Sequence, residues 1–244
     1  MRPIGFPRHC RGVAAAVVAA LVLSSYVSAP RFAEDEIASS VRVEEHARHT
    51  FLTTATQSRA TGLIFYPGGL VSAQAYVPLL DDIAAAGYPV VIAHMPLGLA
   101  VFAPMRGVGM TSEYPGVTRW IIAGHSLGGA MAARAVFREP DAFGGLILVA
   151  SYPANSDDLS DRNIPVVSIY ADADGVATVE EIESAKPLLP PDTTFVEIAG
   201  GNHAQFGSYG EQDGDYEASI PRDVQQRLTV RAMLQLLDSF SPAP

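Results

Sequence analysis

The chain of 244 residues is long enough for one sizeable core, and its composition, with 48% hydrophobic and 17% charged residues, indicates a folded protein. Its formal charge of −10 at pH 7 argues against nucleic acid and against an anionic membrane surface as partners. A single cysteine, Cys10, excludes a disulfide within the chain. No group of Cys and His has zinc-site spacing, and we expect neither a metal nor a cofactor.

The N-terminus has the layout of a secretory signal or a signal anchor. Arginines among the first 11 residues precede an uncharged, mostly apolar run over residues 12–29, close to the minimum of about 17 residues for crossing a bilayer. Pro30 would hinder cleavage after this run, which favours an uncleaved anchor. We therefore expect residues 1–32 to be a signal peptide or signal anchor of an extracytoplasmic protein, secreted or anchored to the cell membrane.

Beyond this segment, residues 33–60 are predicted to form a linker and one or two edge strands. From residue 61 to 240, short apolar runs alternate with helical patterns. Strands are predicted at 62–66, 89–93, 118–123, 145–150, 166–170 and 194–198, and helices at 75–86, 130–138, 180–189 and 223–240. This alternation predicts an α/β fold, with a doubly wound, mostly parallel sheet flanked by helices, in one domain over residues 61–240.

Two stretches of this domain carry more specific predictions. Residues 97–115 are rich in Gly, Pro and Met and are expected to form a short helix with loops. In the last helix, apolar spacing predicts five side chains that face the core. They are Val224, Leu228, Ala232, Leu236 and Leu237.

A Gly-x-Ser-x-Gly turn at residues 124–128 joins a predicted strand to a predicted helix. In this setting the turn lifts a serine to a sharp, exposed corner, because glycines let the strand and helix approach closely. Ser126 is therefore the candidate nucleophile. The amide of Leu127, at the helix N-terminus, is expected to face the negative charge that develops during attack.

A serine hydroxyl is a weak nucleophile and needs a base, which in turn needs an orienting carboxylate. His203 is the only histidine after Ser126 and follows the last predicted strand, at the sheet edge where sites of open α/β folds lie. Asp172 and Asp174 both follow the preceding strand. Asp174 is favoured as the acid because it lies further into the turn, whereas Asp172 could cap the loop.

A second amide is needed to bind the developing oxyanion, and the turn at residues 67–70 is its natural source. Its glycines allow the backbone to approach a substrate closely. Gly69 is the favoured donor, although the sequence leaves open which amide of the turn donates.

These motifs resemble those of the alpha/beta-hydrolase superfamily, and more narrowly those of small bacterial alpha/beta hydrolases of dienelactone-hydrolase-like size, here with a serine nucleophile. The resemblance covers residues 62–240. It rests on Phe65-Tyr66-Pro67-Gly68-Gly69, Gly124-His125-Ser126-Leu127-Gly128-Gly129 and Gly200-Gly201-Asn202-His203-Ala204-Gln205-Phe206-Gly207, with Tyr209-Gly210 and Gln212 beyond. It implies an alpha/beta-hydrolase fold with Ser126 as nucleophile, Asp174 as acid and His203 as base. Residues 151–163, where many such enzymes insert a cap domain, are too few for one.

The sequence thus predicts a serine hydrolase that cleaves carboxylic esters or thioesters through an acyl-enzyme. The expected partner is a small-molecule ester or acyl substrate, and no oligomeric state is predicted. An acyltransferase acting on a cell-envelope acceptor, or a non-catalytic binding protein of the same fold, is the alternative. Six apolar residues near the predicted site could line it for an acyl chain, or pack in the core. They are Met95, Leu97, Phe102, Met105, Met110 and Phe206.

Overall fold

The computed structural model describes residues 40–55 and 59–240. The predicted signal or anchor segment, residues 1–32, lies outside the described residues. Among the residues that are described, no helix is both long and apolar enough to cross a bilayer.

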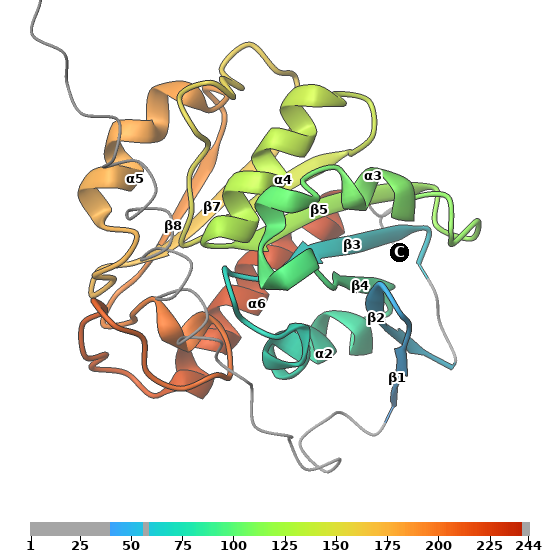
Figure 1. Ribbon diagram of the computed structural model, residues 1–244, viewed down its shortest axis with the longest axis horizontal. Coiled ribbons are helices and arrows are strands. Elements are labelled where there is room, and N and C mark those ends of the chain that lie inside the picture. The colour runs from blue at the N-terminus through green and yellow to red at the C-terminus, as the bar shows by residue number, and fades with distance from the viewer. Residues whose placement is uncertain (1–39, 56–58, 241–244) are drawn as a thin grey trace, which may run out of the picture.

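Within the described residues, eight strands form one sheet in the spatial order β1-β2-β4-β3-β5-β6-β7-β8 (Figure 1). The strands are β1 (Val41–Glu45), β2 (His49–Thr54), β3 (Thr61–Tyr66), β4 (Val90–Ala93), β5 (Arg119–His125), β6 (Gly145–Val149), β7 (Val166–Ala171) and β8 (Thr194–Ile198). Strands β3 to β8 are parallel, whereas β1 and β2 form an antiparallel hairpin on the edge beside β4. The predicted doubly wound, mostly parallel sheet is confirmed.

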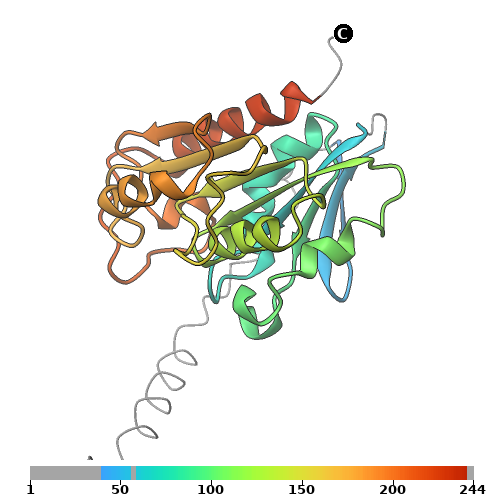
Figure 2. The same ribbon diagram turned by 90° about the horizontal axis from the view of Figure 1, so that it is seen from above.

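Helices cover both faces of the sheet. The helices are α2 (Val77–Ala85), α3 (Arg106–Met110), α4 (Leu127–Arg138), α5 (Val179–Ala185) and α6 (Arg222–Ser239). Short 3₁₀ turns separate some of these elements: η2 (Ala73–Tyr76), η3 (Pro96–Gly98), η4 (Ala100–Phe102), η5 (Lys186–Leu188) and η6 (Ala204–Phe206). Figure 2 shows α2 and α6 on one face and α3 and α4 on the other.

Alternation along the strands builds a separate core on each face. In β3, Leu63 and Phe65 pack in the core beneath α2 and α6, while Ile64 and Tyr66 pack in the core beneath α4. A period of two residues in a strand sends successive side chains to opposite faces. Because both faces are covered, the central strands read as continuous apolar runs, which is why the sequence located them.

The closing helix departs in its first half from the core-facing positions that the apolar spacing predicted. Leu228 is 37% exposed and Val224 is only partly buried, whereas Gln225 is fully buried. The side chain of Gln225 accepts a hydrogen bond from the Asn202 amide and donates one to the Asn202 carbonyl. A buried polar side chain with both partners satisfied carries little penalty, and it fixes the rotation of the helix. The other three predicted positions are buried: Ala232, Leu236 and Leu237.

Two further expectations concern the surroundings of the predicted site. Between β6 and β7 the chain forms only turns and extended segments, so the prediction of no large cap domain is confirmed. Met110 and Phe206 are 1% and 0% exposed and belong to the core, so they do not line an open site. Leu97 and Phe102, in contrast, are exposed.

Candidate active site

Ser126 lies at the corner between β5 and α4, in a backbone conformation that L-residues rarely adopt, with φ 53° and ψ −124°. The flanking glycines make this corner sterically possible. A Cβ on Gly128 would lie 2.2 Å from the Tyr66 carbonyl oxygen, and a Cβ on Gly124 would lie 2.4 Å from the Gly128 carbonyl carbon. Ser126 is partly exposed, as a nucleophile that must meet a substrate has to be.

The neighbouring strand holds the corner in place. The Ser126 amide donates to the Val149 carbonyl at 3.0 Å. The Ser126 carbonyl accepts a hydrogen bond from the Ser151 hydroxyl at 2.7 Å, in addition to amides of the first turn of α4. Both polar backbone groups of Ser126 are therefore satisfied, which lets the strained conformation persist.

Backbone strain gathers at this edge of the sheet. Within the described residues, positive φ values at non-glycine positions occur at Leu70, Leu97, Ser126 and Ala150. They follow β3, β4, β5 and β6 respectively, each within four residues of the strand's carboxyl end. Strain of this kind persists where the surrounding structure enforces it, and it concentrates at functional sites.

His203 and Asp174 meet in a buried hydrogen bond at the same edge. The His203 Nδ1–H donates to Asp174 Oδ2 at 2.8 Å, and the two residues are 0% and 2% exposed. The other carboxylate oxygen of Asp174 accepts from the amides of Val176 (2.8 Å) and Ala177 (2.7 Å). The carboxylate is thus fixed from its own loop, and it sets the histidine tautomer that leaves Nε2 to accept a proton.

The second candidate acid has a different partner. Asp172 is exposed, and its Oδ1 accepts a hydrogen bond from the Gly200 amide at 2.6 Å. It therefore caps the turn after β8, the structural role that the sequence left open for it. Of the two aspartates, Asp174 is the one that contacts His203.

The corner at Ser126 and the loop that carries His203 are in contact through His125, the residue before Ser126. The rings of His125 and His203 have centroids 4.4 Å apart. The Nε2 atom of His203 is buried and has no hydrogen-bond partner among the described residues. His203 thus contacts the residue next to Ser126 in the chain, and its Nε2 is a buried acceptor without a partner among the described residues, as a base that is to take the proton of a serine must be.

The two residues that carry the candidate oxyanion amides are neighbours in space. A Cβ on Gly69 would come within 3.1 Å of Leu127 Cδ2. The amides that flank Gly69 are both engaged, since Gly68 donates to the Tyr76 hydroxyl at 3.0 Å and Leu70 donates to the Gly98 carbonyl at 2.7 Å. The Gly69 amide has no acceptor in the described part of the chain, and Leu127 begins α4, where amides lack an intrahelical acceptor.

A tyrosine that no sequence pattern indicated connects these parts. The Tyr76 hydroxyl accepts from the Gly68 amide and shares a hydrogen bond of 2.8 Å with His125 Nδ1. Burial raises the pKa of Tyr76, so the hydroxyl keeps its proton. Burial, and then the neighbouring His203, hold the pKa of His125 well below its ordinary value of 6.5. His125 is therefore neutral, and Tyr76 links the turn at residues 67–70 to the corner at Ser126.

The stability of the fold is expected to fall as the pH drops below 6.5. A histidine that stays neutral when folded but is protonated when unfolded favours the unfolded state below its ordinary pKa. The pKa values of His49 and His94 are also lowered, in each case mainly by burial. Melting temperatures measured from pH 7 to pH 5 should fall for the natural chain and fall less for His125→Gln. Equal slopes in the two proteins would contradict a neutral, buried His125.

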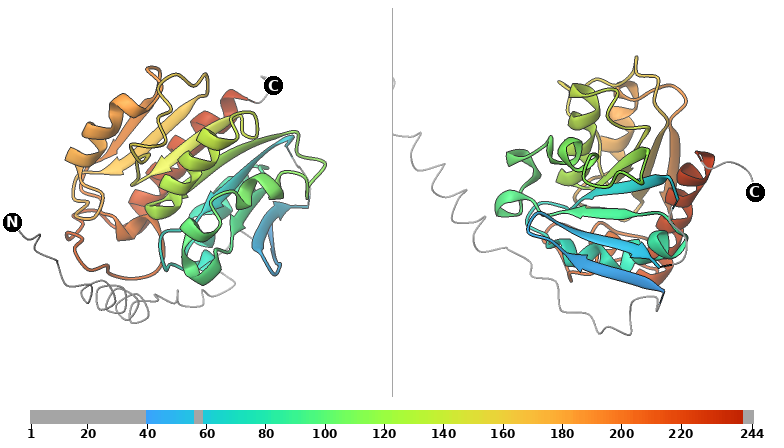
Figure 3. Two further views of the ribbon diagram at one scale, coloured as in Figure 1. Left: turned by 45° about the horizontal axis from the view of Figure 1, so that its top comes forward. Right: turned by 90° about the vertical axis from the view of Figure 1, so that its right-hand side faces the viewer.

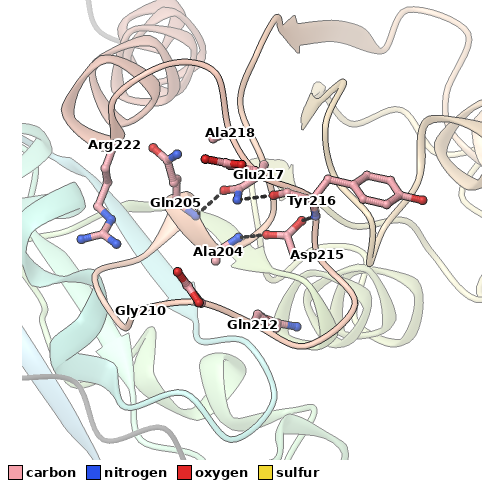
Figure 4. A pocket seen from close by; sticks show the side chains of 11 residues that line it. Ala204, Gln205, Gly210, Gln212, Asp215, Tyr216, Glu217, Ala218 and Arg222 are labelled. Atoms are coloured by element: carbon pink, nitrogen blue, oxygen red, sulfur yellow. Dashed lines mark hydrogen bonds between the residues drawn. The ribbon is translucent and has the colours of Figure 1, made fainter.

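Asp215, which no sequence pattern indicated, connects the loop of Asp174 to the loop of His203. Asp215 Oδ1 accepts from the amides of Gly175 (3.1 Å), His203 (3.1 Å) and Tyr216 (3.0 Å), and its Oδ2 accepts from Ala204 (2.8 Å). Figure 4 shows the bond from Ala204 to Asp215. Because Gly175 follows Asp174, one carboxylate holds the backbone on both sides of the His203–Asp174 pair.

Asp215→Ala is expected to lower kcat by about 10²-fold with a much smaller change in KM, because small displacements of catalytic groups have effects of this size. The matched control is Asp213→Ala, which removes an exposed carboxylate of the same loop and should leave kcat unchanged. Steady-state kinetics with a soluble ester and a melting curve decide the matter. A lowered melting temperature with an unchanged kcat would make Asp215 a purely structural residue.

A polar cavity of about 710 Å³ lies beside the histidine loop rather than at Ser126. Figure 4 shows the Arg222 side chain pointing into it, opposite Asp215. The two residues that flank His203, Asn202 and Ala204, belong to its wall. Ser126 does not belong to this wall, and it is itself partly exposed.

Comparisons with known proteins agree with this architecture. A model of the Alpha/beta hydrolase family matches residues 62–227. No curated protein sequence gives a significant match.

Three solved structures have a fold similar to that of this chain. A predicted CIB-like hydrolase from Thermoplasma acidophilum is 16% identical, with a TM-score of 0.61 over 80% of this chain and 99% of that chain. Est1E from Butyrivibrio proteoclasticus is 15% identical, with a TM-score of 0.56 over 82% and 100%. A membrane phospholipase A, titled a novel bacterial virulence factor, is 15% identical, with a TM-score of 0.62 over 93% and 94%. At these identities the likeness is one of fold.

Proposed function

The chain belongs to the Alpha/beta hydrolase family, and we propose that it is a serine hydrolase that cleaves carboxylic esters or thioesters through an acyl-enzyme. The observation that carries the proposal is the buried hydrogen bond between His203 and Asp174, 2.8 Å long, with the free Nε2 of His203 on the side of the ring away from the acid. That arrangement serves a base whose proton comes from a nearby hydroxyl.

In the proposed reaction, Ser126 Oγ attacks the carbonyl carbon of the substrate while His203 Nε2 takes the hydroxyl proton. Asp174 stabilises the imidazolium that forms, and the amides of Leu127 and Gly69 bind the oxyanion. The tetrahedral intermediate expels the alcohol or thiol, which receives the proton from His203. Water then attacks the acyl-enzyme, His203 takes its proton, and the carboxylic acid leaves as Ser126 regains its hydrogen.

The names of two proteins with similar folds also support the proposal. One similar structure is a membrane phospholipase A and another is Est1E, and the name phospholipase describes cleavage of an ester bond by that protein. The open corner at Ser126, without a large cap, suits a substrate whose acyl group enters from the surface. Acyl transfer needs the same residues and differs from hydrolysis only in that an alcohol replaces water in the attack on the acyl-enzyme. The products therefore distinguish the two reactions.

Hydrolysis of p-nitrophenyl esters of increasing acyl length by the purified full chain tests the proposal, with and without an added alcohol. We expect release of nitrophenol with the free acid as the main product under both conditions. The acyl-alcohol ester as the main product would make the protein an acyltransferase instead. No turnover of any ester or thioester would leave a binding protein and overturn the proposal.

We further propose that the catalytic domain lies outside the cytoplasm, held there or exported by residues 1–32. Three arginines before the apolar run and acidic residues after it support this orientation. Protease added to intact spheroplasts that carry the full chain should digest the domain, while a cytoplasmic marker protein stays intact. A protected, full-length chain in the soluble cytosol would contradict the orientation.

A further inference from the structure

One stretch of the surface is unusually apolar for so acidic a protein. Leu97 is 79% exposed, Phe102 is 60% exposed and Val101 is 43% exposed. All three belong to η3 and η4, the two successive turns that follow β4, and we call residues 96–102 the apolar lip. The other large apolar side chains that are exposed among the described residues, Tyr216 and Leu228, lie apart from it in the chain.

The lip stands directly beside the candidate oxyanion turn. The Gly98 carbonyl accepts the Leu70 amide at 2.7 Å, and Leu99 Cδ2 lies 3.7 Å from where a Cβ on Gly69 would be. On its other side, η4 packs against α4, the helix that begins after Ser126. Figures 2 and 3 show this green segment projecting from the body of the molecule. Exposed apolar side chains thus lie along one side of the candidate site.

The backbone of the lip holds its most exposed side chain outward at a conformational cost. Leu97 has φ 53°, a value that leucine rarely adopts and that glycine would adopt without strain. Burial of the side chain does not offset this conformational cost, because Leu97 is the most exposed of the large apolar residues described. A strained, outward-facing leucine beside a site indicates a surface that makes contact with something apolar.

The distribution of charge points to the same kind of partner. No aspartate or glutamate occurs between Asp82 and Glu113, in a chain with a formal charge of −10. The loop at residues 207–218, beyond the His203 side of the site, carries four acidic residues: Glu211, Asp213, Asp215 and Glu217. The lip itself thus carries no charged side chain in an acidic molecule, and it can approach an electrically neutral lipid surface without the repulsion that an anionic surface would cause.

We propose that the apolar lip docks on a zwitterionic lipid surface and that the ester cleaved at Ser126 belongs to a lipid drawn from that surface; the second part rests on the proposed function. Leu97 and Phe102 enter the interface between headgroups and acyl chains, as side chains of this kind do. The oxyanion turn, which the lip contacts through Gly98, then lies at the depth of the lipid ester groups. The eleven residues between Ala29 and Val41 span at most about 40 Å, so an inserted N-terminal run would keep the domain near the bilayer.

Fluorescence of the full chain tests the docking. In a Cys10→Ser background, an environment-sensitive fluorophore is placed at Leu97→Cys or Phe102→Cys, and at Tyr216→Cys or Leu228→Cys as controls at exposed apolar positions outside the lip. The proteins are combined with phosphatidylcholine vesicles that contain lipids with a quencher on the acyl chain. We expect a blue-shifted emission and quenching at positions 97 and 102 only.

Three outcomes would overturn the docking. Labels at 97 and 102 that stay in water, or controls quenched to the same extent, exclude a specific lipid contact at the lip. A blue shift at position 97 without vesicles that grows with protein concentration assigns the lip to a second copy of the chain. Quenching that requires anionic phosphatidylglycerol excludes the neutral-surface character argued from the charges.

A kinetic comparison tests the lipid substrate separately. For each variant, the rate on a long-chain ester embedded in the vesicles is divided by the rate on a soluble short-chain ester. Leu97→Asp combined with Phe102→Asp should lower this ratio about tenfold or more, because two side chains that would enter lipid become charged. Tyr216→Asp combined with Leu228→Asp should leave it unchanged. An unchanged ratio in the lip variant overturns the lipid substrate, whereas an inactive natural chain overturns the proposed function and leaves the quenching result standing.

Discussion

The Ser126→Ala variant is expected to fold as the natural chain does and to lose ester turnover by about 10⁴-fold or more, the scale seen when a catalytic serine is removed from other serine hydrolases. Without the hydroxyl, no acyl-enzyme can form, and only binding and the oxyanion amides remain. The fold should tolerate the change, because alanine at φ 53° is strained no more than serine is, and the hydrogen bonds at this position come from the backbone.

Ser151→Ala is the matched control for this experiment. It also removes one hydroxyl at the same corner, 2.7 Å from the Ser126 carbonyl, but it leaves the proposed nucleophile in place. We expect a loss of about 1 kcal/mol in stability and only a modest change in kcat. Turnover of a soluble ester and melting curves of both variants are the measurement. A Ser126→Ala variant that still turns over at a substantial rate would remove Ser126 from the reaction.

Asp174→Asn is expected to cut kcat by about 10⁴-fold, the effect of the equivalent change in a well-studied serine protease. The structure gives the reason. Two amides, of Val176 and Ala177, bind one side-chain oxygen of Asp174, so the single oxygen of asparagine will take that position. The NH₂ group then faces His203 Nδ1 and forces the ring proton to Nε2, the nitrogen that must accept the proton of Ser126.

Asp172→Asn separates this effect from any loss of a carboxylate near the site. Asp172 is exposed, and its bond from the Gly200 amide can be kept by the asparagine oxygen, so we expect a change of about 1 kcal/mol or less in stability and no change in kcat. Measuring kcat and melting temperature for both variants tests the assignment. An inactive Asp172→Asn with an active Asp174→Asn would place the acid two residues earlier.

Local sequence was sufficient for the elements and the corner at Ser126, because the information lies in contiguous residues. The central strands are buried on both faces and read as apolar runs, and Gly124 and Gly128 mark a close approach that no side chain permits. The assignment of His203 followed from its being the last histidine in the chain. The choice between Asp172 and Asp174 needed the structure, because both residues follow the same strand. Only the geometry of the loop shows which carboxylate turns toward His203.

What the sequence did not indicate depends on contacts between distant segments. Asp215 gains its importance from three amides on two other loops, and Tyr76 from the turn at Gly68 and the ring of His125. Neither residue belongs to a motif of its own. Two positions in the first half of α6, Val224 and Leu228, were misjudged because apolar spacing cannot foresee that Gln225 will be buried by bonds to the backbone of Asn202.

Labelling of the full chain with a fluorophosphonate, followed by mass spectrometry of the intact protein and its peptides, tests the central claim most directly. The reagent reacts with a serine only where a base activates its hydroxyl. We predict one added group per chain, on the peptide that contains Ser126, and none on Ser126→Ala. A label on another residue, or one that persists in Ser126→Ala, would contradict the assignment of Ser126 as the nucleophile.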